Sequence, residues 1–112
     1  MEFISWPDFE KIDIRVGTIK TAIEFEGLKK PAFKLLIDFG PELGLKQSSA
    51  QITALYQPRD LIGKQVIAVI NFPPKQIKNF FSECLVLGIY NENNDVVLLR
   101  PDKEVSNGTK IG

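Results

Sequence analysis

The chain has 112 residues, of which 44% are hydrophobic and 25% are charged, and its 14 basic and 14 acidic residues balance to a net charge of zero. This length suits one globular domain with a single core. Histidine is absent and Cys84 is the single cysteine, which excludes histidine-based catalysis, histidine-ligated zinc and an internal disulfide. We therefore expect no enzyme activity, no metal and no cofactor. A cytoplasmic location without membrane insertion is expected, because neither a membrane span nor signal-peptide features are found.

A short helix is predicted at the N-terminus, followed by a long bent strand. Ser5, Pro7 and Asp8 have the spacing of a helix cap, a first-turn proline and a first-turn acid, which predicts a helix over about residues 6–11. The apolar residues that follow alternate, and the alternation shifts by one position after Gly17. A shift at a glycine predicts a β-bulge that bends the strand, so that it serves two parts of a curled sheet.

Further strands and one further helix are predicted along the rest of the chain. Residues 50–56 carry apolar residues at helical spacing and Pro58 follows them, which predicts a helix. Alternating or short apolar runs bounded by turn residues predict the strands. These strands cover about residues 33–39, 43–49, 64–72, 82–90 and 96–100.

This order of elements indicates the fold. A bent first strand, two more strands, a helix and then two strands is the order of the OB-fold, a five-stranded Greek-key barrel. We therefore predict an all-β chain forming one OB-fold domain over residues 1–112, with a helix between strands three and four. Residues 1–11 would be a short helical N-terminal extension and residues 101–112 a C-terminal extension. A β-sandwich gives a similar string of strands and is the alternative, but the helix favours the barrel.

The connector between the fourth and fifth predicted strands, residues 71–81, is the main candidate for a binding surface. Pro73 and Pro74 fix their backbone angles and remove two amide donors, so the segment should leave the sheet as a stiff loop. At least one of Phe80 and Phe81 should face outward, because neighbouring strand residues point to opposite faces. The alternative is that the connector only covers one end of the barrel. Its interleaved cations and apolar residues are Phe72, Lys75, Ile77, Lys78, Phe80 and Phe81.

Several motifs resemble the tRNA-binding OB domain, which occurs free-standing and as an appendage of methionyl- and tyrosyl-tRNA synthetases. These motifs are Ile12 to Ile19, Leu61 to Val66, Asn71 to Lys75 and Asn107 to Lys110. Two further segments are similar to CsaA, the secretion-associated chaperone branch of that family. They are Lys46 to Ile52 and Ser82 to Gly88.

The resemblance implies a homodimeric chaperone that binds unfolded or export-bound polypeptides without ATP and has tRNA-binding capacity. A structure-directed tRNA-binding protein without a chaperone role is the alternative. Relative to tRNA-binding members, Lys78 takes a basic place, Asn79 a glycine place and Ser82 a serine place. Asn79 tolerates a left-handed backbone as glycine does. Cys84 stands where those members commonly have a second glycine, and we interpret it as a small buried hydrophobe.

Three sets of contact residues are predicted. Aromatic and aliphatic side chains of the connector would bind peptide, since they give large contact areas at low entropic cost, and these are Phe72, Ile77, Phe80 and Phe81. Contacts to tRNA are predicted at Lys46, Lys75, Lys78 and Ser82. Apolar residues outside the barrel pattern would form the dimer interface or plug the barrel, and these are Phe3, Ile4, Trp6 and Phe9.

The carboxylates near the N-terminus are interpreted differently from the connector. Asp8, Glu10 and Asp13 lie close together without the surroundings of a tuned acid–base pair, so they are read as solvated. Because net charge is zero, any RNA binding must come from a local basic patch and should be modest and salt-sensitive.

Overall fold

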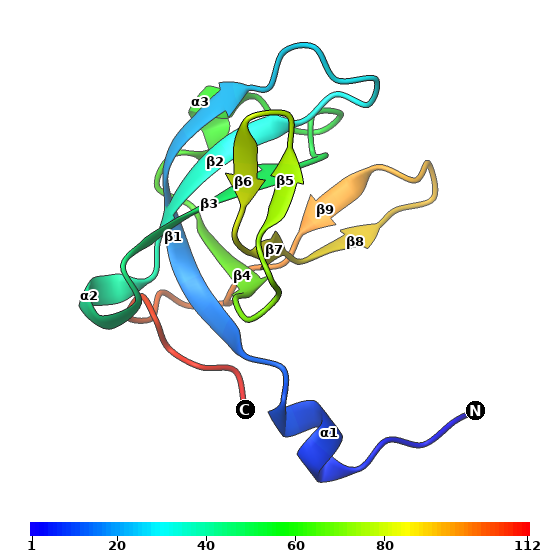
Figure 1. The fold of residues 1–112 in the computed structure, drawn as a ribbon, viewed down its shortest axis with the longest axis vertical. Helices are drawn as coiled ribbons and strands as arrows, with labels where there is room; N and C mark the ends of the chain where they lie inside the picture. Colours follow the sequence, from blue (N-terminus) through cyan, green and yellow to red (C-terminus); the bar gives the residue numbers. More distant parts are fainter.

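A computed structural model describes residues 1–112 as a small barrel with an N-terminal arm (Figure 1). None of its helices is long and apolar enough to cross a membrane. The helices are α1 (Trp6–Glu10), α2 (Gly40–Leu43) and α3 (Pro58–Leu61). The strands are β1 (Ile14–Glu24), β2 (Phe33–Asp38), β3 (Leu45–Ala50), β4 (Gln65–Val69), β5 (Lys75–Ile77), β6 (Phe80–Ser82), β7 (Leu85–Val86), β8 (Gly88–Tyr90) and β9 (Val96–Leu98).

Five strands form one curled sheet in the order β3-β2-β1-β4-β7. The long β1 strand pairs with β4 through its first half and with β2 through its second half, as a bent first strand should. The interior is filled by apolar side chains, of which Ile19, Ile37 and Val66 are fully buried. The mostly β, nearly closed barrel with short helices confirms the predicted OB-fold class.

The predicted bulge at Gly17 was wrong in position. The register of β1 shifts between Ile19 and Thr21, whereas Gly17 lies in regular pairing with Val66 of β4. A β-carbon on Gly17 would lie 2.7 Å from the Ile37 Cγ2 and 2.8 Å from the Phe39 ring. Glycine is therefore needed here for close packing of the core, and the shift in hydrophobic pattern arises a few residues later.

The helix predicted over residues 50–56 was also wrong. That segment forms an irregular turn that places Ile52 in the core and lets the Tyr56 hydroxyl accept a hydrogen bond from the Leu98 N–H at 3.0 Å. The helix between strands three and four is α3, which begins at Pro58 instead of ending before it. Proline suits a first helical turn, because the amide donor that it lacks would have no partner there.

Other boundaries differ from the sequence pattern in smaller ways. Residues 40–43 form the one-turn helix α2, so the third strand begins at Leu45. The predicted strand over residues 82–90 is divided into β7 and β8. The N-terminal helix agrees with its prediction, and the Asp8 N–H donates to the Ser5 Oγ at 3.2 Å in a capping box.

The C-terminal segment pairs with the start of β1. The Gly108 N–H donates to the Val16 carbonyl at 2.7 Å, and the Ile111 N–H donates to the Ile14 carbonyl at 2.9 Å. In Figure 1 the C-terminus therefore lies near the base of the N-terminal arm.

Replacing Gly17 by alanine tests the packing explanation. Alanine in a strand is ordinarily favoured over glycine by about 0.5–1 kcal/mol, but Gly17→Ala should lower the free energy of unfolding by about 1–3 kcal/mol through overpacking. Chemical denaturation measures this difference. In a Phe39→Leu background, which removes the facing ring, the same change should cost less. An unchanged or raised unfolding free energy for Gly17→Ala would contradict the explanation.

Candidate binding groove and basic face

The connector folds back on itself as the hairpin β5–β6. Lys75, Gln76 and Ile77 pair with Ser82, Phe81 and Phe80, so the turn consists of residues 78 and 79. Two-residue hairpin turns require a residue with positive φ. That residue is Lys78, with φ of 56°, and not Asn79, which takes the glycine place and would tolerate that conformation. The stiff loop predicted from Pro73 and Pro74 is therefore short, and the β5–β6 hairpin begins directly after it at Lys75.

Hydrogen bonds join the end of the hairpin to β3. The Glu83 N–H donates to the Gln47 carbonyl at 2.8 Å, and the Gln47 N–H donates to the Glu83 carboxylate at 3.0 Å. The Ser48 hydroxyl donates to the Cys84 carbonyl at 2.9 Å. These contacts close the barrel on the β3 side and fix the hairpin over the sheet.

Ser82, one of the predicted tRNA contacts, takes part in this closure. Its hydroxyl oxygen accepts a hydrogen bond from the Ser49 N–H at 3.1 Å, and the hydroxyl lies 3.4 Å from the Cys84 carbonyl. The side chain is therefore engaged by the protein itself.

The two faces of the hairpin are chemically different. Phe80 points toward the barrel, where its ring meets the buried Phe25 ring edge-on at 5.4 Å, and the Lys34 ammonium lies 5.6 Å from the Phe80 ring centre. Phe81 lies on the other face and is 48% exposed, which confirms that one of the two phenylalanines faces outward. Phe80 therefore anchors the hairpin to the barrel, and Phe81 is its solvent-facing aromatic residue.

A groove runs between the hairpin, the end of β3 and the strands β7 to β9. It consists of two adjoining cavities of about 410 Å³ and about 280 Å³. The residues that line both are Lys75, Ser82, Cys84 and Leu85. The larger cavity has walls that include Ile52, Ile77, Leu87, Tyr90 and Val96, and Phe72 and Pro73 border the smaller one. Lys75 is the single charged side chain in either lining.

Cys84 lies at the junction of the two cavities. It is only 6% exposed, as the interpretation of a small buried hydrophobe requires. Burial raises the pKa of its thiol to about 11, with the Ser48 hydrogen bond and the Lys46 charge acting in the opposite direction. The thiol is therefore protonated at neutral pH and makes a poor nucleophile.

The three lysines predicted to contact tRNA lie on different parts of the surface. Lys75 lines the groove, but Lys78 reaches the β1–β2 loop, where its Nζ occupies the space that a β-carbon on Gly27 would fill. The Lys34 ammonium on β2 lies 4.6 Å from the Phe25 ring centre, and Lys29 is an exposed member of the β1–β2 loop. We call Lys29, Lys30, Lys34 and Lys78 the basic face. Lys46 lies half-buried on β3 and lines neither cavity.

A further cavity of about 510 Å³ lies beside the β1–β2 loop, next to Tyr56 and Pro58. Glu24 and Glu26 are among its lining residues. Their charges make it a poor site for a phosphate group, because like charges repel in a partly enclosed space.

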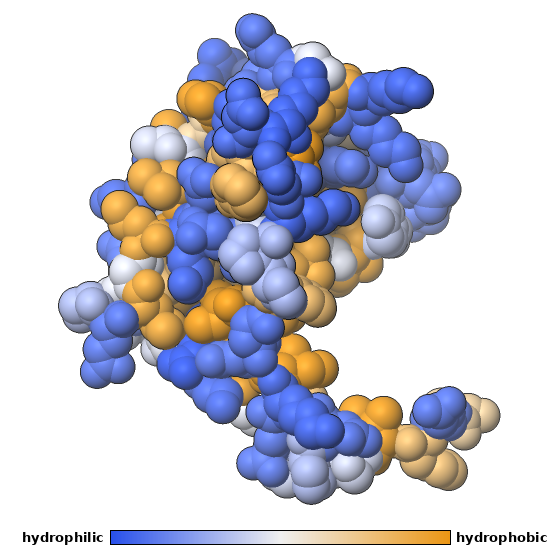
Figure 2. Space-filling view, viewed as in Figure 1, coloured by the Kyte–Doolittle hydropathy of each residue, from blue (hydrophilic) through white to orange (hydrophobic).

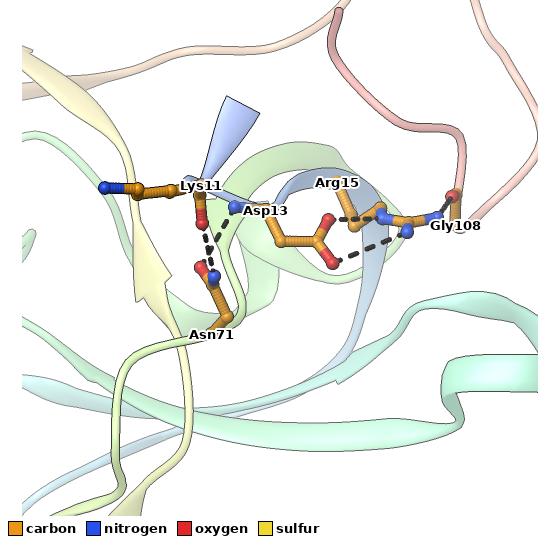
Figure 3. Close-up of polar contacts among 5 residues, drawn as sticks. All are labelled: Lys11, Asp13, Arg15, Asn71 and Gly108. Carbon is orange, nitrogen blue, oxygen red and sulfur yellow. Dashed lines mark hydrogen bonds and ion pairs between the residues drawn. The ribbon is translucent and has the colours of Figure 1, made fainter. Parts of the chain in front are cut away.

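The first residue of the connector is tied to the base of the N-terminal arm (Figure 3). The Asn71 side chain accepts from the Asp13 N–H at 2.9 Å and donates to the Lys11 carbonyl at 2.7 Å. The Asp13 carboxylate pairs with Arg15 at 2.6 Å, and Arg15 donates to the Gly108 carbonyl at 3.0 Å. This hydrogen bond to Asp13 raises the pKa of Arg15. Reading Asp13 as a solvated carboxylate was therefore wrong.

The N-terminal arm extends away from the barrel and carries hydrophobic surface, separated from the barrel by an open hollow (Figure 2). Phe3, Ile4 and Trp6 are 89%, 67% and 63% exposed. Phe9 is half-buried, with its ring 5.4 Å from the Trp6 ring. A shallow pocket of about 380 Å³ is lined by Ile4, Ser5, Trp6, Phe9 and Gly112. None of the four predicted residues fills the barrel, so a barrel plug is excluded.

The groove walls contributed by β7, β8 and β9 were missed in the sequence. Leu85 and Leu87 belong to an apolar run that predicts a buried strand, yet Leu85 is 49% exposed. The residue that could have revealed this wall in the sequence is Gly88. It lies close to Val96 and Val97, and a β-carbon on Gly88 would meet the Val96 Cγ1. A glycine in a strand marks such a close approach, and here it allows the β8–β9 hairpin to form one wall.

The nearly closed barrel, with a groove under one hairpin and a basic face beside it, defines a binding domain of the OB-fold class. The chain belongs to the tRNA-binding domain family, whose model matches residues 14–110. The resemblance read from the sequence motifs is thereby confirmed.

Solved structures and whole-protein relatives refine the comparison. Chaperone CsaA from Bacillus anthracis is 55% identical, with a TM-score of 0.93 over 99% of this chain and 100% of that one. The CsaA chaperone from Picrophilus torridus is 54% identical, with a TM-score of 0.92 over 98% of this chain and 100% of that one. Methionine–tRNA ligase from Methanocaldococcus jannaschii is 36% identical over 99% of this chain, which spans 17% of that enzyme.

Proposed function

We propose that this protein is a homodimeric, ATP-independent chaperone that holds apolar segments of unfolded or export-bound polypeptides in the groove beneath the β5–β6 hairpin. It would act in the cytoplasm before export and would be neither an enzyme nor dependent on a cofactor. The observation that carries the proposal is the apolar groove with a single cation at its rim. The high identity to proteins described as CsaA chaperones, over nearly the full chain, supports it.

The groove offers apolar surface without requiring the protein to unfold. Leu85 is 49% exposed, Tyr90 is 73% exposed and Phe72 is 55% exposed. Covering apolar surface yields roughly 25 cal/mol per Å², so a client segment of a few large side chains would gain several kcal/mol before ordering costs. We propose Phe72 and Ile77 as peptide contacts, together with Leu85 and Tyr90. Phe80 would act through the position of the hairpin.

Binding of tRNA is the second candidate, favoured by the family membership and by the basic face. Lys78 and Lys34 lie next to the β1–β2 loop that carries Lys29 and Lys30. The loops flanking an OB-fold sheet are where such domains bind oligonucleotides. With only a few cations, we expect modest affinity that falls with salt.

The proposal of a homodimer rests on the N-terminal arm. Large apolar side chains gathered on a projecting segment mark an interaction site more often than free surface. A second copy is the proposed occupant, since most oligomers of soluble proteins are symmetric dimers.

Serine at two groove positions tests the chaperone. Leu85→Ser with Tyr90→Ser should raise the concentration that half-protects a denatured client from aggregation by at least about tenfold, because buried apolar anchors dominate such binding. Light scattering of refolding citrate synthase gives this concentration. The melting temperature should change little, since both side chains are exposed.

Phe81→Ser is the matched control, because it removes an aromatic side chain as exposed as Leu85 from the face of the hairpin that points away from the groove. It should protect the client as the parent does. If Phe81→Ser loses protection while the groove variant keeps it, peptide binds to the outer face. Loss by neither variant would remove the groove proposal.

Charge reversal on the basic face tests RNA binding. Lys78→Glu should weaken binding of bulk tRNA across sequences, and should reduce the slope of log K against log salt by about one, as expected for loss of a phosphate contact. Lys75→Glu, in the groove, should leave that slope unchanged. Filter binding at several salt concentrations measures both. A larger effect of Lys75→Glu would contradict the assignment to the basic face.

The dimer proposal predicts a mass twice the monomer value of 12.6 kDa in light scattering at micromolar concentration. Ile4→Ser with Trp6→Ser should give the monomer mass, because the apolar contact on the arm is lost. Ile62→Ser removes an apolar side chain of similar exposure from the barrel and should remain dimeric. A monomeric parent protein would contradict the proposal directly.

A further inference from the structure

The groove lies between two short hairpins that each present a free strand edge. The β5–β6 hairpin supplies Lys75 and Ile77 to the lining, and the β8–β9 hairpin supplies Gly88, Tyr90 and Val96. In Figure 1 the strand β5 is the member of its hairpin on the side of β8 and β9, while β6 lies toward the main sheet. Each hairpin forms a two-stranded sheet of its own, so β5 and β8 have one partner each.

The register of the first hairpin leaves the backbone of Gln76 unpaired. Ile77 and Phe80 close a two-residue turn, so they are the pair that exchanges both N–H···O bonds. Hydrogen-bonded pairs alternate with non-bonded ones, and Gln76 with Phe81 is the next, non-bonded pair. The N–H and C=O of Gln76 therefore point away from β6. The Gln76 side chain is turned aside, since its Nε2 donates to the Lys78 carbonyl at 2.9 Å.

The same reasoning applies on the opposite wall. The Asn91 N–H donates to the Asp95 carbonyl at 2.9 Å, and the Leu99 N–H donates to the Leu87 carbonyl at 3.2 Å. These bonds fix the alternation along the hairpin, so the backbone groups of Gly88 and Tyr90 point away from β9. Unpaired backbone groups bordering an apolar groove are costly to cover with anything that cannot hydrogen-bond to them.

We infer that an extended polypeptide segment binds by adding a strand to the free edge of β5, pairing its backbone with the N–H and C=O of Gln76. This inference rests on the proposed chaperone function and specifies how the client is held. Backbone pairing is indifferent to sequence, while alternate side chains of the added strand enter the apolar groove. Lys75, which has no carboxylate partner within the protein, selects segments with an acidic residue at the matching position.

Proline at position 76 tests the inference without disturbing the bonded pairs of the hairpin. Gln76→Pro removes only the outward N–H, and proline is tolerated on edge strands. Gln76→Ala is the matched control, because it loses the same side chain but keeps the amide. The probe is a fluorescein-labelled ten-residue peptide in which valine alternates with serine and one serine is replaced by glutamate. Fluorescence anisotropy gives its dissociation constant.

The dissociation constant should rise about three- to tenfold for Gln76→Pro, as expected for loss of one backbone hydrogen bond, and stay within about twofold for Gln76→Ala. Equal binding by the parent and by Gln76→Pro would overturn strand addition while leaving the chaperone proposal intact. A parent protein that protects a client but does not bind this peptide would also overturn it. A parent that neither binds peptide nor protects a client would overturn both.

Peptides methylated on backbone nitrogens provide a test that does not depend on folding of the proline variant. In an extended peptide, successive N–H groups point to opposite edges of the strand. Methylation of every second amide therefore removes the hydrogen-bond donors from one edge of the peptide and leaves those of the other edge. One alternate set should abolish binding to the parent protein and the other should leave it nearly unchanged. Equal binding of both methylated peptides would overturn the inference.

Discussion

Closure of the barrel between β3 and residues 81–84 is the interaction on which the remaining surface depends. Gln47 makes four contacts there. Its N–H donates to the Glu83 carboxylate and its side-chain amide donates to the Phe81 carbonyl, each at 3.0 Å. Its carbonyl accepts from the Glu83 N–H and from the Cys84 thiol. The Ser49 N–H adds a bond to the Ser82 hydroxyl of β6, and the Phe80 ring packs on Phe25. Because these contacts are made, a two-stranded element too short to be stable alone is held in one orientation.

The orientation of the hairpin separates two kinds of surface. Its inward face places Lys75 and Ile77 over the apolar groove, whereas its turn carries Lys78 to the β1–β2 loop. Phe80 lies between them, packed on Phe25 beneath Lys34. A chain with zero net charge thereby gathers a few cations on one side of the hairpin and leaves Lys75 as the single charge in the groove. Peptide and RNA binding, if the barrel performs both, would use neighbouring rather than identical surfaces.

Sequence reasoning succeeded where a single local rule decided the outcome. Alternating apolar residues, the Ser5 cap and the bent first strand led to the correct fold class, and strand geometry required one outward ring at Phe80 or Phe81. Sequence reasoning failed where contacts between distant parts of the chain determined the local structure. Glycine is required at position 17 because the Phe39 ring, just beyond the end of β2, packs against it. The helical spacing of residues 50–56 arises because Ile52 and Tyr56 reach the core from an irregular turn.

Asn71 shows the same limit for the candidate surfaces, and its side chain links them. It accepts from the amide of Asp13, 58 residues away in sequence, whose carboxylate pairs locally with Arg15. Asn71 directly precedes Phe72, which borders the groove, and its side chain also holds the carbonyl of Lys11 at the end of α1. The base of the N-terminal arm and the entrance to the hairpin therefore share one side chain. A change in the direction of the arm must break these two hydrogen bonds or move the groove rim with it.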